Sequence, residues 1–445
     1  MAGTRLTRTM GTPTDATKQT LSVWIKLSSN SDYGGIVSSQ YDSGSGGAGH
    51  FSGNNSSIYS NWSTNGSSNV ETRTSALGRD FNGWYHIVSV QDAAQSGSDK
   101  SKIWINGVLQ TGFAADNRSN FSTHANWFAN GKTLYVGSKF DNSLNFDGVM
   151  THLHLCDGYA YTASDFGSFD TVTGEWKINA GPNVNYGNEG FFILKDGNSI
   201  TDQSGNGNDF TLSAGTLSKT EDCPSDIFCT YNRGHYLGTS HTLSNGNTVQ
   251  KETSDVGQRQ VIGTLGAAKG KYYAEFKLAN VGSNVGGSYP YVGCVNINNY
   301  TYNTYLGNNG IAMHPGGNIY RSASVIDSQT SITYTTGDIV SVALDVDNLK
   351  AHFRVNGGTW LASGDPANNT GGYDISSFIT ENENFLTFAS SVYNNNGEWN
   401  TNFGNGYFKT TAVSSAGTNA SEIGIFEYDV PSGFTALSTK GLNSF

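Results

Sequence analysis

The residues best suited to chemistry are aromatic side chains in polar segments of the second half of the chain. Two of these segments, 296–310 and 391–400, mix aromatic residues with Asn and Gly, and a further Trp follows a predicted hairpin turn. Flat aromatic faces beside small hydrogen-bonding residues are typical of surfaces that bind carbohydrate or protein. The pattern predicts a ligand-binding site; the alternative is that the rings pack beneath their own loops. The predicted site residues are Tyr300, Tyr302, Tyr305, Trp360, Tyr393 and Trp399.

Catalytic motifs are absent from the sequence. It contains no G-x-S-x-G nucleophile motif, no H-E-x-x-H zinc motif and no P-loop. Glycosidases need two carboxylates about 5–10 Å apart. The nearest candidates, Glu275, Asp345 and Glu398, are predicted on different strands or loops. The sequence therefore predicts no catalytic residues and no enzymatic activity, and a polysaccharide-degrading protein is the disfavoured alternative.

Histidine and cysteine side chains offer little for a metal centre or a disulfide framework. His152 and His154 alternate on one predicted strand, which places them about 6.8 Å apart on one face. Zinc sites usually need three or four convergent ligands, so a plain pair of histidines on a sheet is the favoured interpretation. Cys223 and Cys229 are close enough in sequence for a small-loop disulfide, but free thiols are favoured because a cytosol is reducing.

One loop resembles a calcium-binding pattern. Asp202, Ser204 and Asn206 occupy its first, third and fifth positions, followed by Gly207. The twelfth residue is Ser213 rather than Glu, and no helices are predicted beside the loop. The sequence predicts a hydrogen-bonded turn, no metal and no cofactor, and it leaves calcium open here as the less favoured alternative.

The composition indicates many short strands joined by turns. Gly occurs 56 times in 445 residues, nearly twice its usual frequency, and charged residues make up only 14%. The net charge of −11 disfavours nucleic-acid binding, which needs a basic surface. No run of about 18 apolar residues is present, so we expect no membrane insertion. No secretory signal is visible either, which predicts synthesis in a cytoplasm.

Two similar hairpins position the candidate residues. In Gly337–Gly358, apolar residues alternate with polar ones along two predicted strands, and Asn356-Gly357 supplies a pair of residues that tolerate positive φ. The segment Gly83–Gln110 repeats this design and ends its hairpin at Asn106-Gly107. Two such hairpins about 250 residues apart predict two similarly built β domains in tandem.

The first half resembles a laminin-G-like, or concanavalin-A-like, jelly roll over about residues 20–175. In that family a W-x-H strand precedes an N-G hairpin, and a strand ending in Gly and an F-x-G closing strand follow. The matching residues are Trp84, His86, Asn106, Gly107, Gly137, Phe146, Asp147 and Gly148. The resemblance implies two packed antiparallel sheets.

The second half resembles the SPRY domain, which is also a concanavalin-like sandwich. The motifs that carry this resemblance are Gly270–Glu275, Tyr291–Gly293, Gly337–Gly357 and Asn402–Phe408. The final stretch, YDVPSGFTALSTKGL, resembles the ending of phage virion proteins that pair these two modules. We predict an all-β chain with a laminin-G-like sandwich at 1–178, a structured connector at 179–227 and a SPRY-like sandwich at 228–445.

The resemblance implies a virion structural protein that displays binding modules. The leading interpretation is a phage tail fibre or spike that recognises a host-surface glycan or protein, and the alternative is a head decoration or capsid fibre protein. Its expected partners are other virion proteins and further copies of itself, most simply a trimer, because displayed modules of weak affinity gain from avidity.

Overall fold

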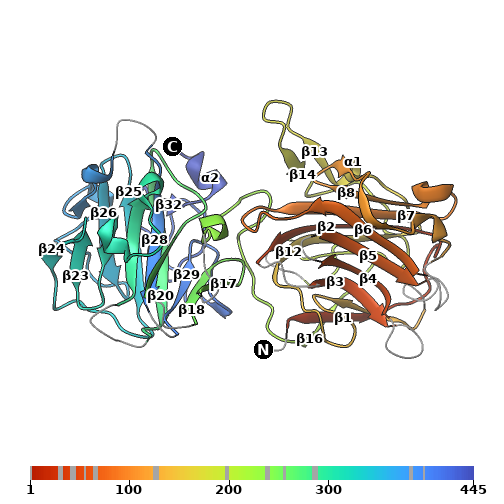
Figure 1. Cartoon of the computed structure of the whole chain (residues 1–445), viewed down its shortest axis with the longest axis horizontal. Helices are drawn as coiled ribbons and strands as arrows, with labels where there is room; N and C mark the ends of the chain where they lie inside the picture. Colours follow the sequence, from red (N-terminus) through yellow and green to blue (C-terminus); the bar gives the residue numbers. More distant parts are fainter. Residues whose placement is uncertain are drawn as a thin grey trace. The chain divides into compact units, whose positions relative to one another are not determined.

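The structure is a computed structural model whose contacts divide the chain into unit 1, Met1–Leu217, and unit 2, Ser218–Phe445 (Figure 1). The division falls inside the segment predicted as a connector. Within the described residues, no helix is long and apolar enough to cross a membrane. The described residues are 3–28, 34–40, 47–54, 57–63, 69–123, 130–195, 200–235, 241–253, 257–282, 289–379, 384–393 and 396–445.

Unit 1 is a sandwich of two antiparallel sheets. One has the order β10-β6-β5-β4-β3-β11-β1-β16, and the other has the order β15-β12-β2-β7-β8-β9. The strands of the first are β1 (Arg5–Thr9), β3 (Gly34–Gln40), β4 (Gly47–Asn54), β5 (Ser57–Ser63), β6 (Asn69–Leu77), β10 (Phe113–Asp116), β11 (Thr133–Val136) and β16 (Thr211–Ala214). Those of the second are β2 (Lys18–Leu27), β7 (Tyr85–Asp92), β8 (Ser101–Ile105), β9 (Val108–Leu109), β12 (Gly148–Asp157) and β15 (Phe191–Ile193).

Alternation along β2 builds the core of unit 1. Leu21, Val23 and Ile25 are fully buried and belong to the core between the two sheets. Val23 lies opposite Ile87 of β7. Strands β4 and β5 occupy much of the segment 42–69, which is rich in Gly, Ser and Asn. Its Gly and Ser residues are poor strand formers, and pairing with β3 and β6 overrides that preference.

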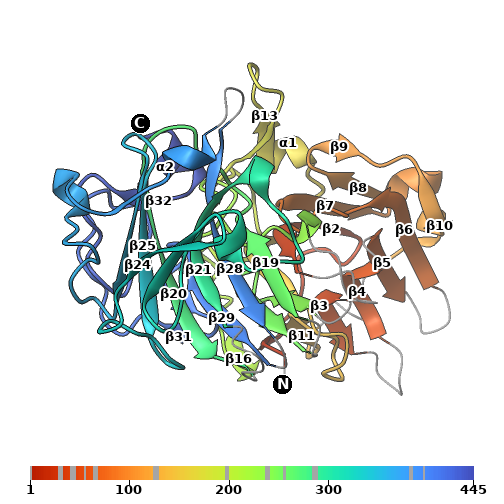
Figure 2. The same ribbon diagram turned by 60° about the vertical axis from the view of Figure 1, so that its left-hand side comes forward.

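A second layer covers the outer face of the β2-β7 sheet. It consists of α1 (Ala163–Phe166) and the hairpin of β13 (Gly167–Phe169) and β14 (Trp176–Ile178), seen at the top of unit 1 in Figure 2. Trp176 Nε1 donates a hydrogen bond of 2.9 Å to Nδ1 of the buried His86, and Trp24 stacks on the same imidazole with ring centroids 4.7 Å apart. This contact fastens the hairpin to the sheet.

Unit 2 repeats the two-sheet design. One sheet runs β17-β18-β29-β20-β25-β26-β27 with β32 beside β20, and the other runs β19-β28-β21-β22-β23-β24. The strands of the first are β17 (His241–Ser244), β18 (Val249–Glu252), β20 (Lys271–Asn280), β25 (Ile339–Asp345), β26 (Lys350–Val355), β27 (Tyr373–Asp374), β29 (Glu398–Asn402) and β32 (Thr435–Ala436). Those of the second are β19 (Gln258–Ile262), β21 (Tyr291–Asn296), β22 (Ile311–Met313), β23 (Asn318–Arg321), β24 (Ser324–Ser328) and β28 (Leu386–Tyr393).

The predicted central hairpin of unit 2 is confirmed. Strands β25 and β26 pair with Val342 opposite Phe353, and both side chains are fully buried. Asn356 and Gly357 have φ angles of 49° and 68°, as the turn prediction required. The first hairpin is confirmed in the same way by the pairing of β7 with β8. The all-β fold class with two tandem sandwiches is therefore correct.

The C-terminal segment, residues 413–442, is part of the unit 2 sandwich. Its residues Phe426, Val430 and Phe434 are buried on the outer face of the β20-β25 sheet, against Tyr273. Strand β32 then fills the position beside the first half of β20 that β29 leaves open. A short hairpin of β30 (Tyr407–Phe408) and β31 (Thr411–Ala412) precedes this segment, and helix α2 (Thr439–Leu442) ends it.

Candidate functional site

The outer face of the six-stranded sheet of unit 2 has an unusual row of small residues. Ala312, Gly293 and Ala389 lie side by side on β22, β21 and β28. Strand alternation turns their larger neighbours, such as Val292, into the core. The segment 297–310 lies over this row and buries Leu306 completely against it. The small side chains therefore provide the room that a surface loop needs to pack on the sheet.

Beside Leu306 this face carries a cluster of aromatic rings, which we call the tyrosine cluster. It consists of Tyr289, Tyr291, Tyr305, His314 and Tyr320. Tyr291 forms its floor, with 6% of its surface exposed, and the other four side chains are half-buried around it. The strands β19, β28 and β21 that carry this face are side by side in Figure 2.

Ring geometry shows that the cluster is tightly packed. Ring centroids are 5.1 Å apart for Tyr291 and Tyr305, 5.5 Å for Tyr291 and Tyr320, and 6.0 Å for Tyr305 and Tyr320. The main chain at Gly307 also lies against these rings, since a Cβ there would be 2.5 Å from Tyr320 Cβ and 3.0 Å from Tyr305 Cε2. The loop and the strands therefore hold the cluster rigidly together.

The cluster carries little charge. Burial lowers the pKa of His314 to about 4, so its imidazole is neutral at physiological pH. Burial also raises the pKa of Tyr291 and of Tyr305. The Gly316 N–H donates to His314 Nδ1 at 2.9 Å, which places the remaining ring hydrogen on Nε2. The arrangement combines aromatic surface with uncharged donors and acceptors.

Four of the predicted site residues, Tyr300, Tyr302, Tyr305 and Tyr393, lie on this outer face, but only Tyr305 belongs to the cluster. Tyr300 and Tyr302 lie over β19, where the Tyr300 hydroxyl donates to the Gln260 carbonyl at 2.9 Å. The Arg259 guanidinium lies 5.4 Å from the centroid of the Tyr302 ring. Both rings are half-buried, so the alternative of packing beneath their own loop holds in part for them.

Tyr393 is half-buried at the end of β28. It alternates with Ser391 and Ala389, and so it projects from the outer face on which the cluster lies. It is opposite Gln258 of β19.

Trp399 is not a surface residue, and its prediction as a stacking ring was wrong. It is fully buried in the core between the two sheets, where its ring contacts Phe276 and Tyr334. Its Nε1–H donates to the Ser391 carbonyl at 3.1 Å. Alternation turns Trp399 of β29 inward together with Phe403, the residue that follows this strand, and burial of the large Trp399 ring outweighs the polarity of its sequence neighbours.

Trp360 lies on the opposite sheet of unit 2, so the structure does not place it in one site with Tyr300, Tyr302 and Tyr305. It packs at the margin of the C-terminal segment, where the Arg354 guanidinium lies 4.5 Å from the ring centroid. Arg354 also donates to the Asp429 carbonyl at 2.5 Å. Trp360 is thus part of the contacts that hold the C-terminal segment on the sheet.

The candidate catalytic carboxylates are all engaged in structural contacts. Glu275 is fully buried, and desolvation raises its pKa to about 7. Its two oxygens accept hydrogen bonds from the Tyr273 hydroxyl, the Asn402 side-chain amide and the main-chain N–H groups of Glu427 and Tyr428. Glu275 therefore anchors the C-terminal segment.

The other two carboxylates are ion-paired and distant from Glu275. Asp345 lies 3.0 Å from Lys271 Nζ, and Glu398 lies 3.0 Å from Lys409 Nζ. Glu275 of β20 lies opposite Ser341 of β25, and Asp345 is four residues beyond Ser341 on β25. The strand rise places Asp345 about 13 Å from the level of Glu275. Pairs of catalytic carboxylates in glycosidases are about 5–10 Å apart. The spacing does not match that requirement.

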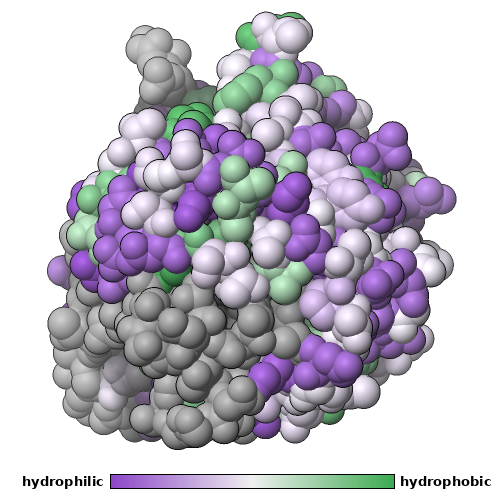
Figure 3. All heavy atoms as spheres, turned by 90° about the vertical axis from the view of Figure 1, so that its right-hand side faces the viewer, coloured by the Kyte–Doolittle hydropathy of each residue, from purple (hydrophilic) through white to green (hydrophobic). Residues whose placement is uncertain are grey.

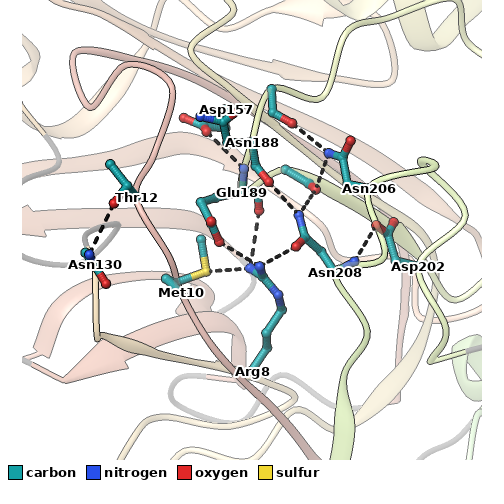
Figure 4. A network of polar contacts seen from close by, with 12 residues as sticks. Arg8, Met10, Thr12, Asn130, Asp157, Asn188, Glu189, Asp202, Asn206 and Asn208 are labelled. Atoms are coloured by element: carbon teal, nitrogen blue, oxygen red, sulfur yellow. Dashed lines mark hydrogen bonds and ion pairs between the residues drawn. The ribbon is translucent and has the colours of Figure 1, made fainter.

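The loop that resembles a calcium site in unit 1 forms a dense hydrogen-bonded turn (Figure 4). Asp202 Oδ1 accepts from the N–H groups of Phe192 and Ser204, and Oδ2 accepts from the Ser204 hydroxyl and the Asn208 N–H. Asn208 in turn accepts a hydrogen bond from Arg8, which pairs with Glu189 at 2.6 Å. Hydrogen bonds from the protein thus occupy both carboxylate oxygens of Asp202, which a calcium ion would need as ligands.

The sequence candidates for metal or disulfide chemistry are the pair His152 and His154 and the four cysteines. A bulge between Thr151 and His154 puts His152 at a φ of 49° and breaks the simple alternation. The two imidazoles are 6.4 Å apart, and among the described residues no group of three His, Cys, Asp or Glu side chains could hold a metal ion. Cys223 and Cys229 are free thiols, as are Cys156 and Cys294.

Unit 1 also carries half-buried aromatic residues, among them Tyr159, Tyr161, Trp176 and Tyr186, in the layer that covers its β2-β7 sheet. On the side drawn in Figure 3, hydrophobic and hydrophilic residues are interspersed over the coloured part of the surface. Its most exposed large apolar residue is Val172, at the turn of the β13–β14 hairpin. The side chain of Trp62, on β5, lies outside the described residues.

One family model matches part of the first half of the chain. Residues 4–165 match a family model described as the concanavalin A-like lectin/glucanases superfamily, all within unit 1. This match confirms the predicted concanavalin-like domain there. No curated protein matches the chain.

Solved structures show weaker likenesses. The SPRY domain of human HERC1 is 16% identical and covers 37% of this chain and 91% of its own, with a TM-score of 0.28. A heptameric SAP-like pentraxin from Limulus polyphemus is 18% identical over 44% and 87%, with a TM-score of 0.31. A putative carbohydrate binding protein from Bacteroides ovatus is 13% identical over 48% and 59%, also with a TM-score of 0.31. These values are too low to support a functional conclusion.

The residues that sequence analysis missed are Tyr289, Tyr291, His314 and Tyr320. Tyr289 and Tyr291 lie at the start of β21, His314 follows β22 and Tyr320 is on β23, and only strand pairing brings these three segments to Tyr305. A local signal existed for Tyr291, which alternates with the small Gly293 on a strand that was predicted. No comparable signal marked the others.

Proposed function

We propose that the protein is a non-enzymatic phage virion protein that displays binding modules, as part of a tail fibre or spike that contacts the host surface. The observation that carries this proposal is the tyrosine cluster, an uncharged aromatic surface on the outer face of a rigid sheet. Such surfaces bind ligands through broad, weakly polar contacts. The motif order and the C-terminal stretch that resemble phage virion proteins support the virion assignment.

Two further features support binding rather than catalysis. Glu275 is saturated by four protein donors, and Asp345 lies about 13 Å further along the sheet. The lectin and glucanase superfamily matched by residues 4–165 includes proteins of both kinds by its description, so the match itself does not decide between them. We therefore infer a role without hydrolysis of the ligand.

Several copies of a weak binding site on one particle bind more tightly together than one copy does. We therefore propose a homo-oligomer, most simply a trimer. Light scattering on the purified full chain tests this directly. A monomer at all concentrations would contradict self-assembly and would leave attachment to another virion protein as the route to multivalency.

The test of function is adsorption of the purified, labelled full chain to host cells. We expect Tyr305→Ala and Tyr320→Ala each to weaken adsorption by about tenfold or more, because each removes a ring from the cluster. Tyr407→Ala is the matched control, since Tyr407 is a half-buried tyrosine on β30, away from the cluster. Circular dichroism would confirm that all three variants fold.

Other outcomes point to other functions. A parent protein that does not adsorb to cells contradicts host recognition and favours the head decoration role. Shortening of host polysaccharide that Glu275→Gln abolishes would contradict the non-enzymatic assignment and favour a degrading spike.

A further inference from the structure

We infer that the tyrosine cluster is a stacking platform for a neutral glycan, with sugar rings lying on Tyr305 and Tyr320 and with His314 as a hydrogen-bond donor. This inference rests on the proposed binding function and goes beyond it by assigning the ligand class and the contact residues.

The spacing of the rings favours a platform over a cage. A cation held between aromatic rings lies within about 6 Å of each ring centroid, so the rings must stand apart to admit it. Here Tyr291, Tyr305 and Tyr320 are themselves only 5.1–6.0 Å apart and contact one another. No room is left between them for a trimethylammonium group. A ligand must therefore lie across their outer surface.

The charge of the surface favours an uncharged ligand. His314 stays neutral down to about pH 4, so it offers no cation to a uronic acid or phosphate. Arg321, which follows Tyr320 on β23, already forms an ion pair with Asp374, with an N···O distance of 3.3 Å. An acidic ligand would lose water from its charged groups without gaining a charged partner.

The polar groups of the cluster match sugar hydroxyls. The Gly316 N–H occupies His314 Nδ1, so the neutral ring carries its hydrogen on Nε2 and can donate there. The tyrosines add hydroxyl groups that both donate and accept. A pyranose ring presents an apolar C–H face to an aromatic ring and hydroxyls around its edge. Protein ligands, by contrast, are usually anchored by large side chains in pockets, and the cluster is a packed surface rather than a pocket.

The test titrates the full chain with neutral gluco-, manno- and galacto-configured oligosaccharides, with oligogalacturonate and with choline. We expect binding of at least one neutral oligosaccharide. Tyr305→Ala and Tyr320→Ala should each weaken it by about tenfold or more. Tyr305→Phe keeps the aromatic face and should weaken it only slightly, and Tyr407→Ala should have no effect. Tighter binding of oligogalacturonate or choline would overturn the inference.

Adsorption to host cells separates this inference from the proposed function. Periodate oxidation of the cells should abolish adsorption, and protease treatment should leave it intact. Adsorption that needs Tyr305 but survives periodate and is lost with protease would overturn the glycan assignment and keep the proposed function. Oligosaccharide binding that needs the cluster, with adsorption unaffected by Tyr305→Ala, would keep the glycan assignment and overturn the proposed function.

Discussion

Acidification should destabilise unit 1 through His86. Its imidazole lies between Trp24 and Trp176, and its Nδ1 accepts a hydrogen bond from Trp176 Nε1. Its Nε2 lies 2.9 Å from the Ser22 hydroxyl. Burial lowers the pKa of His86 from 6.5 to about 3. A protonated ring could no longer accept the hydrogen bond of Trp176, which fastens the β13–β14 hairpin.

The sign and the size of the effect follow from proton linkage. Between about pH 3 and 6.5 the unfolded chain binds a proton at His86 that the folded protein does not bind. The free energy of unfolding therefore rises as the pH rises through this window, and the stability that the neutral His86 contributes is lost as the pH falls. One histidine contributes about 1.4 kcal/mol per pH unit, or about 2.7 kcal/mol between pH 6.5 and 4.5. That is a large share of the roughly 5–15 kcal/mol that stabilises a typical domain.

Urea unfolding at a series of pH values measures this contribution. His86→Phe keeps an aromatic ring but cannot titrate, so it should be less stable at neutral pH and its stability curve should be flatter. We expect the slope for unit 1 to fall by about 1.4 kcal/mol per pH unit between pH 6.5 and 4.5. His241→Phe is the control: burial also lowers the pKa of His241 to about 3, but His241 is in unit 2. Equal slopes for the parent and His86→Phe in unit 1 would refute this reasoning.

Three further changes test individual features. Trp399→Ala should lower the free energy of unfolding of unit 2 by about 3–5 kcal/mol in urea titrations, because it empties a fully buried site. Gly357→Val should cost on the order of 1–3 kcal/mol, measured as a lower Tm, because φ is 68° and a Cβ would lie 2.5 Å from the Tyr428 ring. Asp202→Ala should destabilise unit 1 by about 1–3 kcal/mol through lost hydrogen bonds. Calcium should not change the Tm of the parent; a rise that Asp202→Ala removes would favour a calcium site.

The two central hairpins were readable from sequence because their information is local. Alternation over a few residues determines which side chains face the core, and an Asn-Gly pair with positive φ marks the end of β8 and of β26. Val342 and Phe353 are paired in the core as this pattern requires. The same rule applied to Trp399 and Phe403 would have placed both inside. The Asn-rich neighbours of Trp399 obscured a period-two pattern that was present.

The C-terminal segment and the tyrosine cluster could not be read in this way. Glu275 accepts the main-chain N–H groups of Glu427 and Tyr428, about 150 residues later in the chain, and no local pattern marks such a partner. The cluster likewise depends on the register of β21 with β22 and of β22 with β23. A shift of that register by one residue would turn Tyr291 into the core and Val292 to the surface.

The position of the cluster follows from side-chain size on the sheet beneath it. A large residue at Ala312 or Ala389 would occupy the space in which Leu306 is buried, and the segment 297–310 could not lie flat. Tyr305 would then lose its contact with Tyr291, although both tyrosines would remain in the sequence. Composition alone therefore cannot locate this binding surface. The small residues beneath the loop determine whether its aromatic side chains form one platform or remain separate.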